Sequence, residues 1–534
     1  MNRQLTPQQL EKLREQTIDN LDAAAALDHL GVLIDAGTDS YNQKCIERAI
    51  RQLHSLDQRQ LSDHHAVKSH YYRANAYGAL ANIQRRKSGE HTLMWDCPET
   101  QQQMLALNSA ISHKGFTAHE PTLQCQILTN YGLLLKGVGR VIDAIAQWDK
   151  ALSILPNFGK ARGARGLGLG SYTSMQTDGW HRAILAQHAY DSLESASNPD
   201  AYFESDDAEQ ANLYYRPHAK HLLEHFNIDE IREQNYLAKG ELGKSKAERA
   251  YRAWCLKHRL VLNPLNDLGS WIAASRDELT LPALSEKFGD CTSGALPPPI
   301  FGFFNQLKQE YASARFMLYE GVTAKGVHFS DRQVDIADTL DFSEFSLATE
   351  RVRTAFRIAY SLLDKVALLI NRYMGFDADK NARNVNLSFK NVWFQAKINM
   401  LNPSLLLSKN IGLCGLYWLS KELHDNELIL TTAADARELH AIRNALEHKY
   451  LIVQEGWAAP FIDKQIGDYA LTLGSHELEA KALRVMQIAR SALFYLTFAI
   501  EYEENMKTDT RSTELIATMP ILSMKTSRKR RDHF

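Results

Sequence analysis

The sequence lacks most of the features that mark a protein of a special class. Its formal net charge is −2 over 534 residues, so no overall positive field indicates a nucleic-acid partner, and such a site would have to be local. The longest nearly unbroken apolar run, ALFYLTFAI, is far shorter than the roughly 20 residues that a membrane-spanning helix needs. We therefore expect no membrane association.

The cysteines and the first residues exclude further classes. The 6 cysteines are scattered and form no C-x-x-C pair, which argues against a zinc knuckle or a disulfide framework and favours a reducing compartment. The opening residues, MNRQLTPQQLEKLREQ, lack the apolar core of a signal peptide. We expect a cytoplasmic protein with no cofactor and no bound metal.

The residues that are present predict an all-α fold. A hydrophobic content of 45% and a charged content of 23% are typical of globular proteins, and the length allows about two to four domains. Apolar residues recur at spacings of three and four, while the alternation typical of strands is almost absent. In the C-terminal part this pattern predicts helices over 303–320, 346–374, 391–423, 430–451 and 475–505.

One segment, YGLLLKGVGRVIDAIAQWDKALSILPNFGKA, carries the clearest local pattern. Gly132, Ala144, Trp148, Ala151 and Pro156 fall at the spacings of a tetratricopeptide repeat, and the segment resembles that family. Earlier stretches look like degenerate copies. Because one repeat cannot bury its own apolar face, we expect a stacked solenoid that binds a peptide or protein ligand. An irregular helical bundle is the alternative.

The chain divides into four predicted regions. Helical repeats occupy 1–170, and a helical extension of them occupies 171–292. The stretch KFGDCTSGALPPPIFG combines glycine with three consecutive prolines and predicts a domain boundary. A helical bundle follows over 300–506, and the basic tail over 507–534 is expected to be disordered.

Two motif matches are better explained by ordinary helices and turns. HLLEH, from His221 to His225, has the spacing of an inverted zinc-peptidase motif, but no separate third ligand can be identified, so a solvated helix face is favoured. AKGELGKS, residues 238–245, fits a relaxed phosphate-loop pattern. The residues before it read as a polar helix instead of the buried strand that such a loop requires, so we predict a turn between helices.

The stretch RNALEHKY, residues 443–450, is the strongest candidate for chemistry. Arginine followed five residues later by histidine occurs five times in the chain, but only here does a short amide follow the arginine and a tyrosine lie two residues beyond the histidine. On a helical wheel an apolar seam lies opposite the polar residues. The seam comprises Leu439, Ile442, Leu446, Tyr450 and Val453. A solvated helix face is the competing interpretation.

RNALEHKY resembles the R-polar-x-x-x-H motif of the HEPN superfamily, in the extended form that ends H-x-Y, and the helical array over about 300–506 fits a HEPN bundle. The resemblance implies a metal-independent endoribonuclease. In such an enzyme Arg443 would grip phosphate oxygens, His448 would transfer protons, and Asn444 would orient the histidine or the phosphate. A symmetric homodimer would bring two motifs to one RNA substrate.

Three further residues have weaker assignments. Asp364 could be an acidic partner that positions Arg443, or an ordinary surface carboxylate. Glu447 shares the polar face of the motif and could support it. Tyr450 falls where the extended motif carries a modifiable tyrosine, although its position on the apolar seam favours a packing role.

Together these features predict an RNA-cutting effector restrained or triggered by a helical-repeat sensor, in stress or anti-phage defence. The alternative is a non-catalytic interaction protein whose HEPN region only binds nucleotide or RNA.

Overall fold

The structure is a computed structural model of the chain. It describes residues 6–88, 95–204, 208–285, 298–376, 387–395, 400–424, 434–455 and 470–510, together with residues 521 and 524. The predicted domain boundary over 287–302 and the tail over 507–534 therefore lie for the most part outside the described residues.

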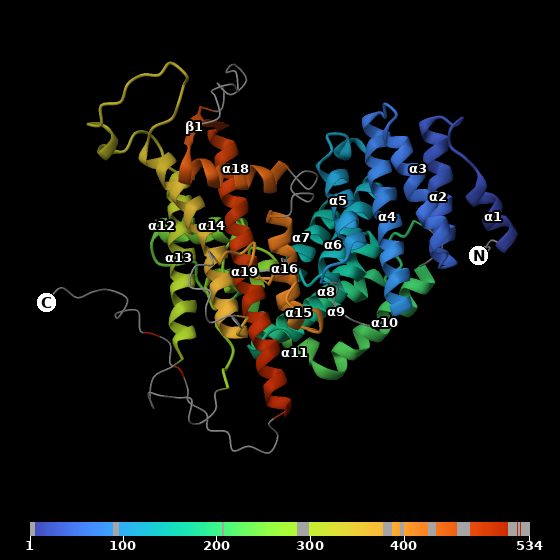
Figure 1. Cartoon of the computed structure of the whole chain (residues 1–534). Coiled ribbons are helices and arrows are strands. Elements are labelled where there is room, and N and C mark those ends of the chain that lie inside the picture. The colour runs from blue at the N-terminus through green and yellow to red at the C-terminus, as the bar shows by residue number, and fades with distance from the viewer. Residues whose placement is uncertain are drawn as a thin grey trace.

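The N-terminal half is built from antiparallel helices that stand side by side (Figure 1). Successive pairs pack against each other, as expected for helical repeats. The helices are α1 (Pro7–Glu15), α2 (Ala23–Asp39), α3 (Gln43–Asp57), α4 (Asp63–Ser88), α5 (Pro98–Ser112), α6 (Pro121–Gly137), α7 (Val141–Ile154), α8 (Gly159–Ser174), α9 (Gly179–Ala196), α10 (Ala208–His225), α11 (Ile228–Gln234) and α12 (Lys246–Lys257).

Trp148 on α7 explains why the repeat pattern needs small residues. Its indole is fully buried between Gly132 on α6 and Gly168 on α8, where an added Cβ would lie 2.4 Å and 2.2 Å from the ring. The indole N–H donates to the carbonyl of Thr129 at 3.2 Å. The predicted helix pair over this segment is confirmed, and the glycine-rich stretch 163–170 lies inside α8 as a close-packing surface.

The C-terminal half is a bundle around the long helix α19, confirming the all-α class apart from a small sheet. By length and composition α19 is apolar enough to cross a membrane over Ser475–Lys507. However, 83% of its most apolar segment is buried inside the protein, and the core helix of a globular protein has the same composition. The elements are α13 (Pro299–Val322), α14 (Leu347–Met374), α15 (Pro403–Leu406), α16 (Ile411–His424), α18 (Ala434–His448), β1 (Tyr450–Gln454), β2 (Ala470–Gly474) and α19 (Ser475–Thr510). The two strands pair in parallel, with Tyr450 opposite Ala470.

One predicted helix in this half is wrong, and another ends earlier than predicted. The helix predicted over 391–423 is broken: an isolated bridge joins Phe394 to Leu401, and the next helices begin at Pro403 and Ile411. A proline is tolerated in the first turn of a helix but not in its interior, so Pro403 starts a helix instead of lying within one. The helix predicted over 430–451 ends at His448, and Tyr450 already belongs to β1.

Buried charges join the two halves. Arg490 on α19 donates to Asp267 at 2.8 Å, and both side chains are at most 2% exposed. Arg140, at the start of α7, pairs with Asp143 at 2.9 Å and also with Glu422 on α16. One hydrophobic core runs from Val67 to Ile500 and so packs the bundle against the repeats, while α1 to α4 also form a second core cluster of their own.

Candidate functional site

Helix α18 carries the motif as one polar stripe. His440, Asn444 and His448 recur every four residues, and Arg443 lies beside them, so these side chains share one face of the helix. The opposite face is buried through Leu439, Ile442, Leu446 and Ala445. The predicted division of this helix into an apolar seam and a polar face is therefore confirmed for the residues that are helical.

Two arginines of α14 hold the end of this helix. Arg357 donates to the backbone carbonyl of Leu446 at 2.8 Å, and Arg353 donates to the carbonyl of Leu451 in β1 at 2.9 Å. The last carbonyls of a helix have no partner within the helix and carry partial negative charge, so cations stabilise them. These two contacts anchor the backbone on either side of His448, the last residue of α18, which is exposed.

Arg443, Asn444 and His440 form a chain of hydrogen bonds. Arg443 Nη1 donates to Asn444 Oδ1 at 3.2 Å, and Asn444 Nδ2 lies 3.0 Å from His440 Nε2. Asn444 was expected to orient a histidine or a phosphate. Its amide contacts His440 and Arg443 within the described part of the chain.

Two neighbouring helices add aromatic groups to this cluster. The ring of His424, at the end of α16, lies 6.3 Å from the rings of both His440 and Tyr360, edge to face in each case. Burial, together with the nearby His440, Lys390 and Arg443, lowers the pKa of His424 to about 4. His424 is therefore neutral at physiological pH.

Tyr360 on α14 presents a buried hydroxyl to this region. Among the described residues that hydroxyl has no hydrogen-bond partner. Burial raises the pKa of Tyr360, while the charge of Arg443 opposes the rise and that of Asp364 adds to it. A buried polar group without a partner is costly, which is consistent with a group that a ligand completes.

The C-terminal bundle matches a known family. Residues 291–503 match the family model described as LA2681-like HEPN. These residues are a HEPN domain. In the same comparisons no curated protein and no solved structure matches the chain. The HEPN match includes α18, so RNALEHKY lies within the domain whose motif it resembles.

The three residues with weaker assignments, Asp364, Glu447 and Tyr450, all lie within the HEPN domain. Asp364 Oδ1 accepts the backbone N–H of Phe389 at 2.8 Å, and no contact between Asp364 and Arg443 is present in the described region. Glu447 is exposed beside His448. Tyr450 is 40% exposed, because the helix ends before it, so the packing role expected from the helical seam does not apply.

Sequence reasoning missed three members of the cluster. His440 could have been found, because it precedes Asn444 by four residues and so shares its helix face. His424 and Tyr360 come from other helices. Only the tertiary arrangement brings them to the motif.

Other candidate sites lie outside this cluster. The His221, Glu224 and His225 side chains have ligand atoms within 4.8 Å of one another, and all three are exposed on α10. The phosphate-loop match over 238–245 is confirmed as a turn between helices, since Ser245 caps α12.

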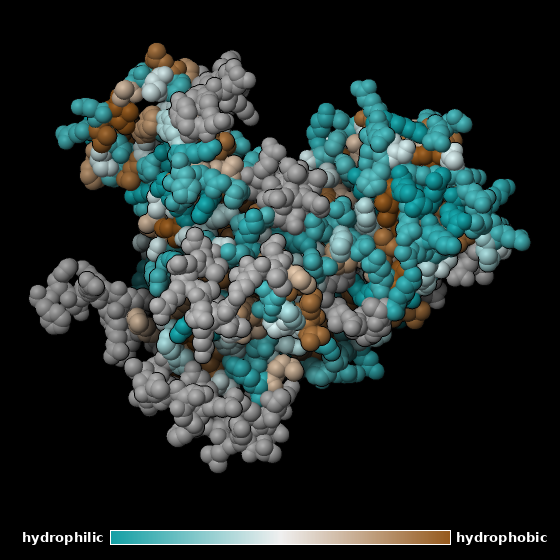
Figure 2. All heavy atoms as spheres, viewed as in Figure 1, coloured by the Kyte–Doolittle hydropathy of each residue, from teal (hydrophilic) through white to brown (hydrophobic). Residues whose placement is uncertain are grey.

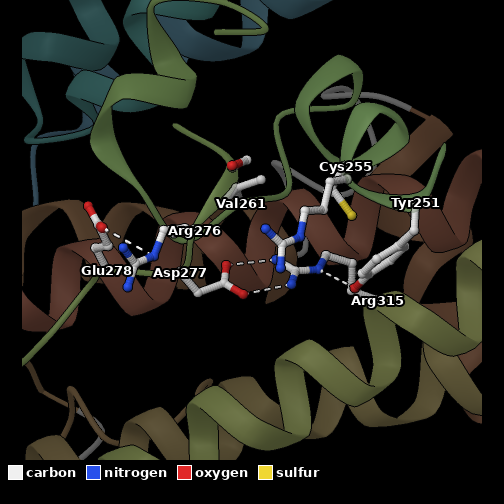
Figure 3. A pocket seen from close by; sticks show the side chains of 9 residues that line it. Tyr251, Cys255, Val261, Arg276, Asp277, Glu278 and Arg315 are labelled. Carbon is white, nitrogen blue, oxygen red and sulfur yellow. Dashed lines mark hydrogen bonds and ion pairs between the residues drawn. The ribbon is translucent and has the colours of Figure 1, made fainter. Parts of the chain in front are cut away.

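A cavity of about 430 Å³ lies between α12 and α13 (Figure 3). Its central cation, Arg315, donates to both carboxylate oxygens of Asp277 at 2.8 Å and 2.7 Å and to the Tyr251 hydroxyl at 2.9 Å. The contacts made by this guanidinium join α13 to the segment around residue 277, which indicates a structural role.

Proposed function

We propose that the protein is a metal-independent endoribonuclease of the HEPN type. The observation that supports this most strongly is that Arg443 is partly buried without a carboxylate partner among the described residues. It lies on the helix that ends at the exposed His448. Arginine can grip two phosphate oxygens at once, so a guanidinium without a carboxylate partner, on the same helix as an exposed imidazole, suits a scissile phosphate.

The chemistry requires two proton transfers. The imidazole of His448 takes the proton of the ribose 2′-hydroxyl, whose oxygen attacks the phosphorus. The bond from phosphorus to the 5′-oxygen breaks, and a protonated imidazole, the partner subunit's His448, donates its proton to that departing oxygen. Arg443 stabilises the charge that develops on the phosphate. The products are a 2′,3′-cyclic phosphate and a 5′-hydroxyl.

The assay that tests this proposal is cleavage of RNA by the full chain in excess EDTA. We expect cleavage with cyclic phosphate ends, while DNA of the same sequence stays intact because it has no 2′-hydroxyl. If the protein binds RNA without cutting it, and expression in cells is harmless, the alternative of a non-catalytic RNA- or nucleotide-binding protein is favoured. An effector role in cytoplasmic stress or phage defence would follow from cleavage triggered by a signal.

An apolar arm offers a surface for the second copy. Residues 323–346 form this arm, and Figure 2 shows hydrophobic atoms gathered where Figure 1 places it. Its exposed apolar side chains are Val327, Phe329, Val334, Ile336, Leu340, Phe342 and Phe345. The arm ends beside β1, where Glu344 N donates to the Val453 carbonyl at 2.7 Å. A contiguous exposed apolar patch commonly marks an interaction site.

Replacing Phe329 and Leu340 with serine should therefore dissociate the proposed dimer. Light scattering over a dilution series should give a dimer for the natural protein and a monomer with weaker RNA cleavage for the double variant. The control is Leu407→Ser, because Leu407 is similarly exposed but lies directly after α15, away from the arm. A natural protein that stays monomeric on dilution and still cuts RNA would contradict the shared-site proposal.

Helix α16 is a physical link between the repeats and the motif. Glu422 in its last turn pairs with Arg140 of the repeat region, and His424, two residues later, lies in the motif cluster. Lys421 in the same turn pairs with Asp96 at 2.8 Å. A ligand that moves α7 would thus act on the turn that positions His424, which supports regulation by the repeats.

The Glu422→Gln variant should change the basal RNA-cleavage rate by about 5-fold or more, the lower end of typical coupling between sites. Arg140 keeps its contact with Asp143, so the fold should persist, and circular dichroism can check this. Glu310→Gln serves as the control, because Glu310 pairs with Lys365 away from the repeats. Equal rates for both variants would remove this route of regulation.

A further inference from the structure

The hydrogen bonds of the motif have a direction that chemistry fixes. A guanidinium carries only donors, so the atom of Asn444 that faces Arg443 must be its oxygen. The amide NH₂ of Asn444 is then the group that faces His440, and it too is a donor. His440 Nε2 must therefore accept. The ring carries its single proton on Nδ1 and is neutral.

The surroundings of His440 favour this neutral form. Although its side chain is exposed, partial desolvation of the ring lowers its pKa, and the cations Arg443 and Lys390 lower it further. His424, facing it from α16, is itself neutral at physiological pH. On α14, Tyr360 and Asp364 flank the cluster. On α18 itself, the Glu438 carboxylate pairs with Lys481 of α19.

We propose that His440 is a positioning residue that holds Arg443 in its phosphate-binding pose through Asn444. This inference rests on the proposed role of Arg443 in RNA cleavage. When His440 is neutral, Asn444 is held at both ends and its oxygen is kept on the guanidinium. When His440 is protonated, its Nε2 becomes a donor, and both His440 and Arg443 then compete for the one amide oxygen. The arginine loses its fixed pose.

The sign of the pH dependence follows. Because the neutral ring is the working form and its pKa is lowered, positioning of Arg443 is complete at neutral pH. It is lost as the pH falls through that lowered pKa. His440 therefore contributes an acid-side loss of activity in addition to any contribution from His448.

The tautomer can be measured without any assay of activity. In protein labelled with ¹⁵N-histidine, the His440 signals, assigned by their absence in His440→Gln, should show Nδ1 protonated and Nε2 unprotonated at pH 7.5. In the Asn444→Leu variant, which cannot donate, His440 should shift toward the Nε2-protonated tautomer that free histidine prefers. A protonated Nε2 in the natural protein would overturn the proposal.

Two substitutions then separate positioning from packing. His440→Gln keeps an acceptor near the place of Nε2 and does not titrate, so kcat/KM at pH 7.5 should stay within about 3-fold of the natural protein, with a shallower acid limb. His440→Lys presents only donors and should lose roughly 100-fold, the scale of removing one oriented donor to the reacting group. Equal losses in both variants, with folds intact, would reduce His440 to a packing residue.

The outcomes for the two proposals are distinguishable. If the natural protein cuts no RNA, the proposed function fails. The ¹⁵N measurement of the tautomer still tests the proposed hydrogen bonds of His440. The affinity for single-stranded RNA replaces cleavage as the readout in that case. His440→Lys should then weaken Arg443-dependent binding despite its added positive charge, and tighter binding would overturn positioning.

Discussion

The His448→Ala variant should lose RNA cleavage by roughly 100- to 10,000-fold, the usual contribution of a positioned proton-transfer group. His448 is exposed at the end of α18, where its ring packs into no core, so the substitution should leave the fold unchanged. Arg443→Ala should be comparably inactive, because the charge on the phosphate is then unopposed. Rates are measured on one RNA under saturating and subsaturating conditions, together with thermal unfolding.

The chain supplies a matched control for this test. His221 also follows an arginine, Arg216, by five residues, and it is exposed on another helix, α10. His221→Ala should cut RNA at the natural rate. If His448→Ala were as active as His221→Ala, His448 would not be a catalytic residue.

The largest effect on stability is expected at the buried pair of Asp267 and Arg490. The Asp267→Asn variant keeps the shape of the side chain but leaves the guanidinium buried without its charge partner, and it turns one of the two oxygens that accept from Arg490 and Tyr172 into a donor. Breaking such a pair typically costs about 3–5 kcal/mol. Urea unfolding should show a loss of this size in one cooperative transition, since Asp267 and Arg490 come from different halves of the chain.

An exposed carboxylate provides the comparison. Glu11→Gln removes the same charge from a solvent-exposed pair with Arg14 on α1 and should change stability by less than about 1 kcal/mol. A similarly small change for Asp267→Asn would show that the junction of the two halves does not depend on the buried ion pair.

Local patterns account for what the sequence predicted correctly. Small residues around Trp148 and the three-and-four spacing of α14 and α19 are properties of neighbouring residues, so the helix pairs and the bundle were predictable. The break within 391–423 was also readable, because Pro403 disfavours a helix interior. It was missed because the apolar spacing continues across it.

The remaining errors involve distant contacts. The apolar residues of β1 also fit the helical seam of α18, and a run of five residues cannot be assigned by periodicity alone. Only pairing with β2, beyond residue 455, makes it a strand. In the same way, His424 and Tyr360 join the motif cluster through the packing of α14 and α16 on α18, so no spacing in the sequence could place them there.

The most direct test of the proposed cleavage by the 2′-oxygen removes a single 2′-hydroxyl from an RNA substrate. Once the cleaved linkage of an RNA substrate has been mapped, the nucleotide on its 5′ side is synthesised without its 2′-hydroxyl, and cleavage is followed in EDTA. The account predicts that this linkage stays intact while other susceptible linkages are cut at the natural rate. Cleavage of the modified linkage at an unchanged rate would contradict attack by the 2′-oxygen, and with it the role proposed for Arg443 and His448.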